Sequence, residues 1–202
     1  MTAPDASLGL RERKNRRTQL AIVRAAAELT VEGGYAAATI PRIAERADVA
    51  PRTVSTWFPV KDHILFDRVD DTLARANQHL RNGPGDVVDR IEAWLADESA
   101  REQPDPEISR LRYTAIAHDA ELRARDRQHL EQVQAEIAQA VARDIGTPAE
   151  DVGPQVLAGA AMALLSTLRL LALDERDDAT AQLAVGIELL RVGLAALSSA
   201  DR

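Results

Sequence analysis

Hydrogen-bond donors cluster in one short segment of the chain, residues 39–61, TIPRIAERADVAPRTVSTWFPVK. An arginine and three hydroxyl side chains stand there between apolar residues: Arg52, Thr53, Ser55 and Thr56. Guanidinium and hydroxyl groups suit phosphate oxygens and the acceptor atoms on base edges. These residue types therefore indicate a surface for nucleic acid.

Two short helices joined by a tight turn would position these donors. Apolar residues recur at helical spacing on both sides of Asp48: Ile40, Ile43, Ala44, Val49, Val54 and Phe58. Thr39 is a suitable N-cap for the first helix, and Pro41 falls in its first turn, where a missing N–H does no harm. The second helix begins with Pro51 and ends before Pro59.

The outward face of that second helix follows from a rotation of 100° per residue. If Val54 and Phe58 face inward, Thr53 flanks one side and Trp57 lies near the edge. The residues that then point outward are Arg52, Ser55 and Thr56. This is the arrangement that a DNA-recognition helix requires.

Positive charge is concentrated at the N-terminal end of an acidic chain with a net charge of −7. Residues 1–61 carry ten Lys or Arg against six Asp or Glu, giving +4, whereas residues 62–202 carry fifteen against twenty-six, giving −11. A basic end attracts phosphates and orients the molecule on approach. A solvated basic terminus would explain the arginines from Arg11 to Arg17, but not the adjoining two-helix motif.

The overall composition is ordinary for a globular protein, with 46% apolar and 28% charged residues. The absence of cysteine excludes disulfides, thiolate nucleophiles and zinc sites of the Cys type. The N-terminus lacks the apolar core of a signal peptide, and the longest apolar stretch, residues 156–168, is shorter than the roughly 20 residues that span a bilayer. We expect a cytoplasmic protein with no membrane segment, no metal and no cofactor.

Helical patterns fill the chain and predict an all-α fold. Ile22, Ala25, Ala26 and Leu29 mark a first helix that Gly33-Gly34 ends. Beyond Lys61, helices are expected at residues 62–81, 85–101, 107–118, 120–145, 152–174 and 177–198. Glycine and proline clusters separate them.

Several motifs in this order resemble the N-terminal domain of the TetR family, the tetracycline-repressor-like bacterial transcription regulators. The match runs from about Arg13 to Leu65 and comprises Gly33-Gly34-Tyr35, Thr39, the IAERA run at 43–47, Arg52-Thr53, Trp57-Phe58 and Lys61. The resemblance implies phosphate contacts by Thr39, Trp57 and Lys61. It implies base contacts by Arg52, Thr53, Ser55 and Thr56. Arg52 could equally bind a phosphate or lie in solvent, and Trp57 could serve the core alone.

Two positions depart from the family's usual pattern. Asp48 stands where glycine is common in the turn, although aspartate tolerates the left-handed conformation better than most residues. Ala50 stands where a capping serine is common, so that position has no side-chain cap and no hydroxyl for a phosphate.

The resemblance also implies the domain organisation and the activity. Residues 1–12 form a flexible tail, residues 13–65 a three-helix helix-turn-helix DNA-binding domain, and residues 66–202 a helical bundle for ligand binding and dimerisation. The expected protein is a regulator, a repressor, that binds a near-palindromic double-stranded operator as a homodimer. A small-molecule effector of unknown identity releases it.

Leucine-rich seams on the last two helices are the predicted dimer interface. Both have a spacing of four, three, four and three: Leu157, Ala161, Leu164, Leu168 and Leu171, then Leu183, Ile187, Leu190, Leu194 and Leu197. Gly159, Gly186 and Gly193 would allow close approach of the helices. The seams could also be the core of one chain. The resemblance favours a four-helix interface with two helices from each subunit.

Residues on the middle helices are candidates for ligand contacts, because apolar walls with a few polar anchors form ligand pockets: Trp94, Tyr113 and His118. Each could equally be an ordinary core or surface residue. Arg110 and Arg112 could meet an anionic ligand, or could pair with Glu107 and Asp119.

Two other functions are alternatives. An effector-independent helical DNA-binding protein would share the N-terminal features and ignore small molecules. A small helical enzyme is disfavoured, because the four histidines are scattered and the chain has no HExxH motif, phosphate loop or nucleophile elbow. The acid pairs Asp70-Asp71 and Asp177-Asp178 would diverge by about 100° on a helix and could not easily share a metal. We therefore expect no enzymatic activity.

Overall fold

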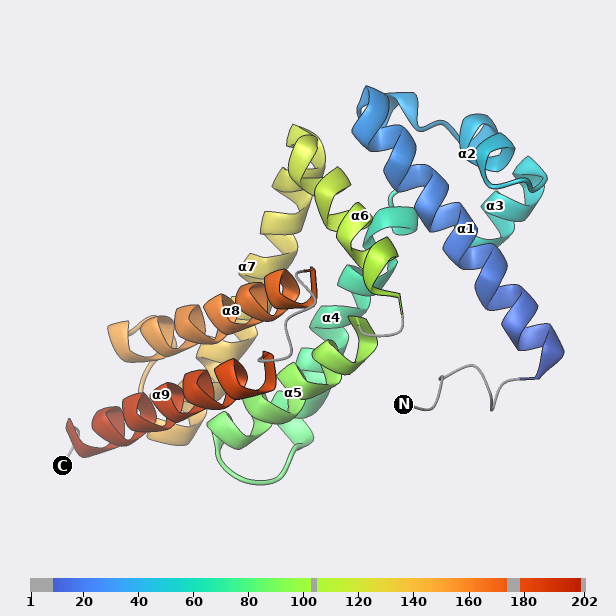
Figure 1. Cartoon of the computed structure of the whole chain (residues 1–202). Helices are drawn as coiled ribbons and strands as arrows, with labels where there is room; N and C mark the ends of the chain where they lie inside the picture. Colours follow the sequence, from blue (N-terminus) through green and yellow to red (C-terminus); the bar gives the residue numbers. More distant parts are fainter. Residues whose placement is uncertain (1–8, 103–104, 174–178, 201–202) are drawn as a thin grey trace. The chain divides into compact units, whose positions relative to one another are not determined.

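A computed structural model describes residues 9–102, 105–173 and 179–200, and every regular element in these ranges is a helix (Figure 1). This confirms the all-α prediction. The elements are α1 Leu10–Gly33, a 3-10 turn η1 Tyr35–Ala37, α2 Ile40–Arg46, α3 Pro51–Trp57, α4 His63–Asn82, α5 Val87–Glu102, α6 Pro106–His118, α7 Ala120–Ile145, α8 Val152–Leu173 and α9 Ala179–Ala200. Helix α1 begins at Leu10, so three residues of the expected tail are helical.

The chain forms two compact units. Unit 1 comprises Met1–Asp70 and Pro104–Asp126, and unit 2 comprises Asp71–Gln103 and Arg127–Arg202. The sequence-based division placed everything after residue 65 in one domain. Helix α6 and the start of α7 instead group with the N-terminal helices, because their apolar residues share the same core.

The core of unit 1 holds α1, α2, α3 and α6 together. Ile22 of α1, Ile43 of α2 and Val54 of α3 are each fully buried, and Ile116 of α6 joins them at 4% exposure. Two ion pairs add to the contact between α1 and α6: Arg16 with Asp105 at 2.8 Å, and Arg24 with Glu107 at 2.8 Å.

Unit 2 is built around the packing of α8 against α9. A Cβ added at Gly186 would lie 2.0 Å from Leu164 Cδ2, and one at Gly193 would lie 2.8 Å from Leu157 Cδ1. These two glycines therefore allow the close approach that the sequence predicted. Gly159 has no such role, because a Cβ there would meet nothing closer than Gln134 Nε2 at 4.0 Å.

The predicted dimer seam packs mostly inside unit 2, which corrects its assignment. Six of its residues are buried in the core: Leu157, Ala161, Leu168, Ile187, Leu190 and Leu194. Leu164 and Leu183 pack against that core, Leu197 is half-buried, and the side chain of Leu171 lies outside the described residues. The 4-3 spacing thus falls on residues that pack in the core of unit 2, which they share with residues of α4, α5 and α7.

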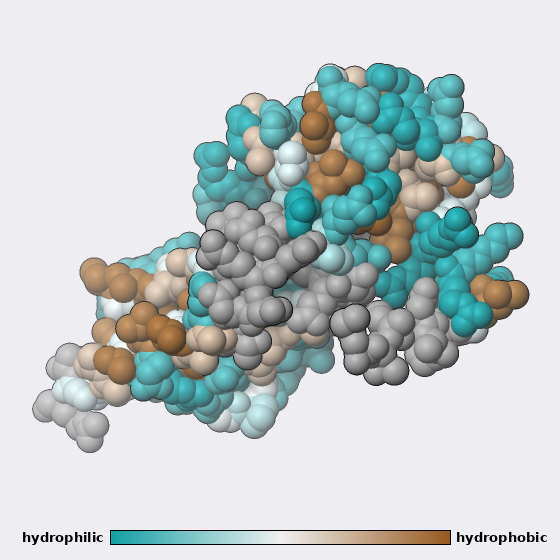
Figure 2. Space-filling view, in the orientation of Figure 1, coloured by the Kyte–Doolittle hydropathy of each residue, from teal (hydrophilic) through white to brown (hydrophobic). Residues whose placement is uncertain are grey.

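A second apolar face on α8 and α9 is exposed, and hydrophobic residues gather over these helices in Figure 2. We call it the outer face, and it consists of Val152 (78% exposed), Val156 (64%), Val185 (65%), Leu189 (69%) and Val192 (60%). Residues 181–199 also have a mean hydropathy of 1.4, with 22% of that window buried. By length and composition this one helix could cross a membrane, which is weak evidence of a membrane span.

Candidate nucleic-acid interface

The start of α2 leaves a hydroxyl group available at the surface. Thr39 is the N-cap residue, with extended backbone angles of −78° and 154°, and Pro41 lies in the first turn as predicted. The Thr39 side chain makes no capping hydrogen bond and is exposed. Its hydroxyl group therefore remains available for a phosphate oxygen.

The turn between α2 and α3 has the left-handed residue that the sequence predicted. Asp48 has a φ of 53°, the one positive value among non-glycine residues in the described ranges. The turn is closed by Val49 N–H, which donates to Ala44 O at 3.0 Å. Ala50 is the N-cap of α3 and provides no side-chain cap. The turn thus accommodates Asp48, whereas α3 begins without a side-chain cap.

Helix α3 presents the polar face that its periodicity predicted. Val54 is fully buried and Phe58, directly after the helix, is 2% exposed. Thr53 and Trp57 are half-buried, and Trp57 packs against the core of unit 1. After Pro51, the exposed residues of the helix are Arg52, Ser55 and Thr56. The Thr56 hydroxyl donates to Arg52 O at 2.8 Å, so its proton is already engaged within the helix.

Lys61 has an internal partner that the sequence did not reveal. Its Nζ donates to Tyr35 O at 2.6 Å and lies 3.7 Å from the centroid of the Tyr35 ring. Burial lowers the pKa of the Lys61 ammonium, while nearby Glu121 and Asp119 oppose that shift. An ammonium group has three N–H donors, so the Tyr35 contact leaves two that could reach a phosphate.

Tyr35 connects this lysine to the residues just before α4 and α7 and, through them, to α7 itself within unit 1. Its hydroxyl group hydrogen-bonds Asp62 Oδ1, and Arg125 of α7 pairs with Asp62 Oδ2. The backbone N–H of Tyr35 donates to Asp119 Oδ2 at 2.9 Å, and this hydrogen bond is the main cause that lowers the pKa of Asp119. No local sequence pattern indicates this network, because its partners are up to 84 residues apart.

Two further arginines near the motif hold the helices in place. The Arg46 guanidinium of α2 donates two parallel hydrogen bonds to the Glu32 carboxylate of α1, at 2.8 and 2.9 Å. It also donates to Glu28 Oε2 at 3.2 Å. The hydrogen bonds to Glu32 are the main reason that the pKa of Arg46 is raised. Arg42 donates to Ala37 O at 2.8 Å. These contacts fix α2 against α1 and η1.

The structure does not bring the predicted ligand residues together within either unit. Trp94 belongs to unit 2, where it is fully buried and its Nε1 has no hydrogen-bond partner. Tyr113 and His118 belong to unit 1. His118 is exposed, with Nδ1 2.9 Å from Thr114 O of the same helix. Among the described residues there is also no group of three or more His, Cys, Asp or Glu that could hold a metal ion.

Two family models match separate parts of the chain. Residues 22–67 match the model for bacterial regulatory proteins of the tetR family. Residues 86–195, more than half of the chain, match the model for the MftR C-terminal domain. The chain belongs to the TetR family. It is therefore a bacterial regulatory protein, and the resemblance of the N-terminal motifs to the TetR pattern is confirmed.

Two curated TetR regulators are similar to parts of the chain. The transcriptional repressor KstR of Rhodococcus jostii (strain RHA1) is 32% identical over 106 residues, which cover 52% of this chain and 49% of KstR. The regulator TcmR of Streptomyces glaucescens is 43% identical over 58 residues, which cover 29% of this chain and 26% of TcmR. The chain thus spans about half or less of the length of these relatives.

Solved structures of TetR-like regulators share the fold. FadR from Bacillus subtilis, in complex with stearoyl-CoA, has a TM-score of 0.61 and 18% identity, covering 86% of this chain and 98% of FadR. GusR of Salmonella enterica has a TM-score of 0.54 and 19% identity, covering 90% of this chain and 95% of GusR. At these identities the likeness concerns the TetR fold alone.

Proposed function

We propose that this TetR-family protein is a ligand-responsive transcriptional repressor that binds a double-stranded DNA operator as a homodimer. One observation carries the proposal: α3 is anchored by the buried Val54 and Phe58 while Arg52 and Ser55 stand exposed on its opposite side. A short helix of this kind can enter the major groove with its first turns against base edges. Arg52, the second residue of α3, is suited to the O6 and N7 acceptors of a guanine.

Phosphate contacts would orient α3 in the groove. Thr39 offers a hydroxyl group at the start of α2, and Lys61 offers the N–H groups that Tyr35 leaves unused. Trp57 combines a half-buried ring with an indole N–H that can donate to a phosphate oxygen. These three residues would fix the register, while Arg52, Thr53, Ser55 and Thr56 would select the sequence.

The outer face of α8 and α9 is the surface we propose for the homodimer. It exposes five large apolar side chains, and contiguous exposed apolar patches commonly mark interfaces. Two copies could pair these faces about a twofold axis, giving a four-helix contact. A dimer of this kind presents two recognition helices, which suits a near-palindromic operator.

A small-molecule effector would control the DNA-binding state. FadR, which shares the fold, was solved with stearoyl-CoA, and this supports a ligand-binding role without identifying the ligand here. Whichever effector binds, it can shift the protein only by its differential affinity for the two conformers. The ion pairs Arg16–Asp105 and Arg24–Glu107 join α6 to α1, so a movement of α6 would act on the DNA-binding helices within unit 1.

The similar proteins are regulators rather than enzymes, and we propose that this chain is also no enzyme and acts in the cytoplasm, where its DNA is. An effector-independent DNA-binding protein is the remaining alternative. A thermal-shift screen of metabolites separates the two, because an effector that binds the folded state raises the unfolding temperature by mass action.

Footprinting of the DNA upstream of the protein's own gene tests the proposal. We expect a protected near-palindrome whose half-sites lie about one helical turn, roughly 34 Å, apart. Protection should weaken when the matching effector is added. If no DNA segment in that region is protected at any protein concentration that leaves competitor DNA unbound, the proposed function is wrong.

A further inference from the structure

Two adjacent residues of opposite charge, Lys61 and Asp62, bind different parts of one tyrosine. Lys61 Nζ lies 3.7 Å from the centroid of the Tyr35 ring and donates to Tyr35 O at 2.6 Å. Asp62 Oδ1 instead accepts from the hydroxyl group at the end of the same ring. Tyr35 is 7% exposed, so its buried ring is a fixed platform for the lysine.

Arg125 of α7 supplies the positive charge that balances Asp62. Its guanidinium pairs with Asp62 Oδ2 and donates to Glu121 Oε1 of the same helix at 2.7 Å. Burial raises the pKa of the Tyr35 hydroxyl group, so that group keeps its proton and stays a donor to Asp62 at neutral pH. Each carboxylate oxygen of Asp62 therefore has a donor, one from η1 and one from α7.

Loss of Arg125 would change what surrounds Lys61. The Asp62 carboxylate would lose its guanidinium partner beside a lysine, and opposite charges at short range attract each other. The ammonium group would then turn from the Tyr35 ring toward Asp62. Fewer of its N–H groups would be left for a phosphate, and the carboxylate would repel that phosphate.

We propose that Arg125 and Tyr35 are positioning residues for the phosphate contact of Lys61. Arg125 fixes Asp62 on the Tyr35 hydroxyl group, and the Tyr35 ring and carbonyl oxygen fix the Lys61 ammonium group. The inference rests on the proposed function, because it concerns how Lys61 binds an operator phosphate. Arg125 acts through Lys61 rather than on the DNA.

The chain has two lysines, so the position of Lys61 can be observed in the free protein. Full-length protein labelled with ¹³C at the lysine ε carbon gives one NMR signal for Lys61 and one for the exposed Lys14. The ring current of Tyr35 should place the Lys61 protons at lower frequency than those of Lys14. Arg125→Gln should move the Lys61 signal toward that of Lys14, which should itself stay in place.

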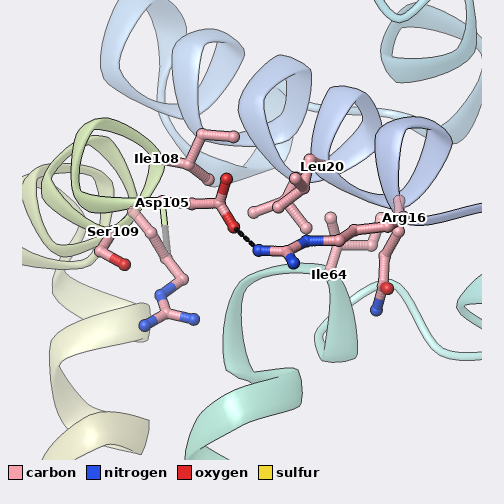
Figure 3. Close-up of a pocket in the computed structure, with 9 residues that line it drawn as sticks. Arg16, Leu20, Ile64, Asp105, Ile108 and Ser109 are labelled. Atoms are coloured by element: carbon pink, nitrogen blue, oxygen red, sulfur yellow. Dashed lines mark hydrogen bonds and ion pairs between the residues drawn. The ribbon is translucent and has the colours of Figure 1, made fainter. Parts of the chain in front are cut away.

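Two controls separate this effect from a general loosening of unit 1. Arg123→Gln removes the same charge from the same helix, but the Arg123 guanidinium donates to Ala117 O at 2.6 Å. Asp105→Asn breaks a different arginine–aspartate pair of unit 1, the one with Arg16 at 2.8 Å that the dashed line in Figure 3 marks. Neither substitution should move the Lys61 signal.

Binding to the footprinted operator at several salt concentrations measures the phosphate contact itself. Lys61→Met should weaken binding about tenfold or more and lower the slope of log affinity against log salt by about one unit for each subunit. Arg125→Gln should weaken binding about fivefold and lower the slope in the same direction. In the Lys61→Met background, Arg125→Gln should cause no further loss, because its effect passes through the lysine.

Tyr35→Phe is a second variant in case Arg125→Gln does not fold, because it keeps the ring and removes the hydroxyl donor. It should also move the Lys61 signal toward that of Lys14. A Lys61 signal that stays in place in the folded variants, or an Arg125→Gln effect that persists in full in the Lys61→Met background, would overturn the inference.

Failure of this inference can be distinguished from failure of the proposed function. If operator binding depends on Lys61 but is the same with and without Arg125, only the positioning role is wrong. If the protein protects no operator, the proposed function is wrong and the positioning role is wrong with it.

Discussion

Leu189 and Leu190 are neighbours on α9, and substitution by alanine should affect dimerisation at the first and subunit stability at the second. Leu189 is 69% exposed on the outer face, whereas Leu190 is 2% exposed in the core of unit 2. Leu190→Ala should lower the free energy of unfolding by about 2–5 kcal/mol, because it opens a cavity. Leu189→Ala should leave the folded subunit nearly unchanged and should weaken dimerisation.

The size of the Leu189 effect follows from its exposed fraction. Leu→Ala removes three carbon groups, each worth about 0.8 kcal/mol when it is buried. Since 69% of the side chain remains to be buried, one copy loses roughly 1.7 kcal/mol. Both copies lose this contact in a symmetric dimer, so the free energy of dimerisation becomes less favourable by about 3 kcal/mol. The dissociation constant of the dimer should therefore rise by about two orders of magnitude.

Sedimentation equilibrium measures the dissociation constant of the dimer directly. Chemical denaturation at several protein concentrations separates the change in dimerisation from the change in subunit stability. Leu10→Ala is the matched control, because Leu10 is a 78% exposed leucine on α1, outside the outer face. The reasoning would be refuted if Leu189→Ala dimerised as tightly as the original protein, or if Leu190→Ala changed the dimer while leaving the unfolding free energy intact.

Substitutions at three further positions test contacts inside the units. Asp119→Ala should cost about 1 kcal/mol or more in thermal unfolding, because Oδ1 caps the start of α7 by accepting from Glu121 N–H at 3.0 Å, while Oδ2 accepts from Tyr35 N–H. Because folding lowers the pKa of Asp119, its carboxylate stabilises the folded state fully above the unfolded pKa of about 4, and this stabilisation is lost as pH falls through the folded pKa. Asp119→Asn should therefore make the unfolding temperature less dependent on pH in that acidic range. Gly186→Val should destabilise unit 2 by about 1–3 kcal/mol in urea unfolding, and an unchanged midpoint would contradict the Leu164 contact. Ala50→Ser should raise the unfolding free energy by about 0.5–2 kcal/mol by capping α3.

The helices and the polar face of α3 could be predicted because they depend on local rules. Glycine and proline positions marked the helix ends, including Gly34, whose φ of 80° ends α1. Rotation by 100° per residue correctly separated the exposed Arg52 from the buried Val54. Even the left-handed Asp48 followed from the chemistry of its side chain.

Partners distant in the sequence could not be predicted. Lys61 contacts Tyr35 across 26 residues, and no local pattern indicates that the lysine is held by a carbonyl oxygen. The apolar surface of α9 illustrates a different difficulty. Because that helix is apolar on two sides, a 4-3 spacing describes both the buried Leu190 and the exposed Leu189, which are adjacent in the sequence. Which side meets the neighbouring helix depends on tertiary packing.

The central claim is that α3 selects a DNA sequence, and one measurement tests it most directly. Fluorescence anisotropy would compare binding to the footprinted operator and to its single-base variants for the original protein, Arg52→Ala and Arg143→Ala, an exposed arginine of unit 2. We predict that Arg52→Ala alone loses about 1–3 kcal/mol of discrimination at one base pair of each half-site. If Arg52→Ala keeps the full preference at every base pair, or loses no more than Arg143→Ala, α3 does not select the sequence as described.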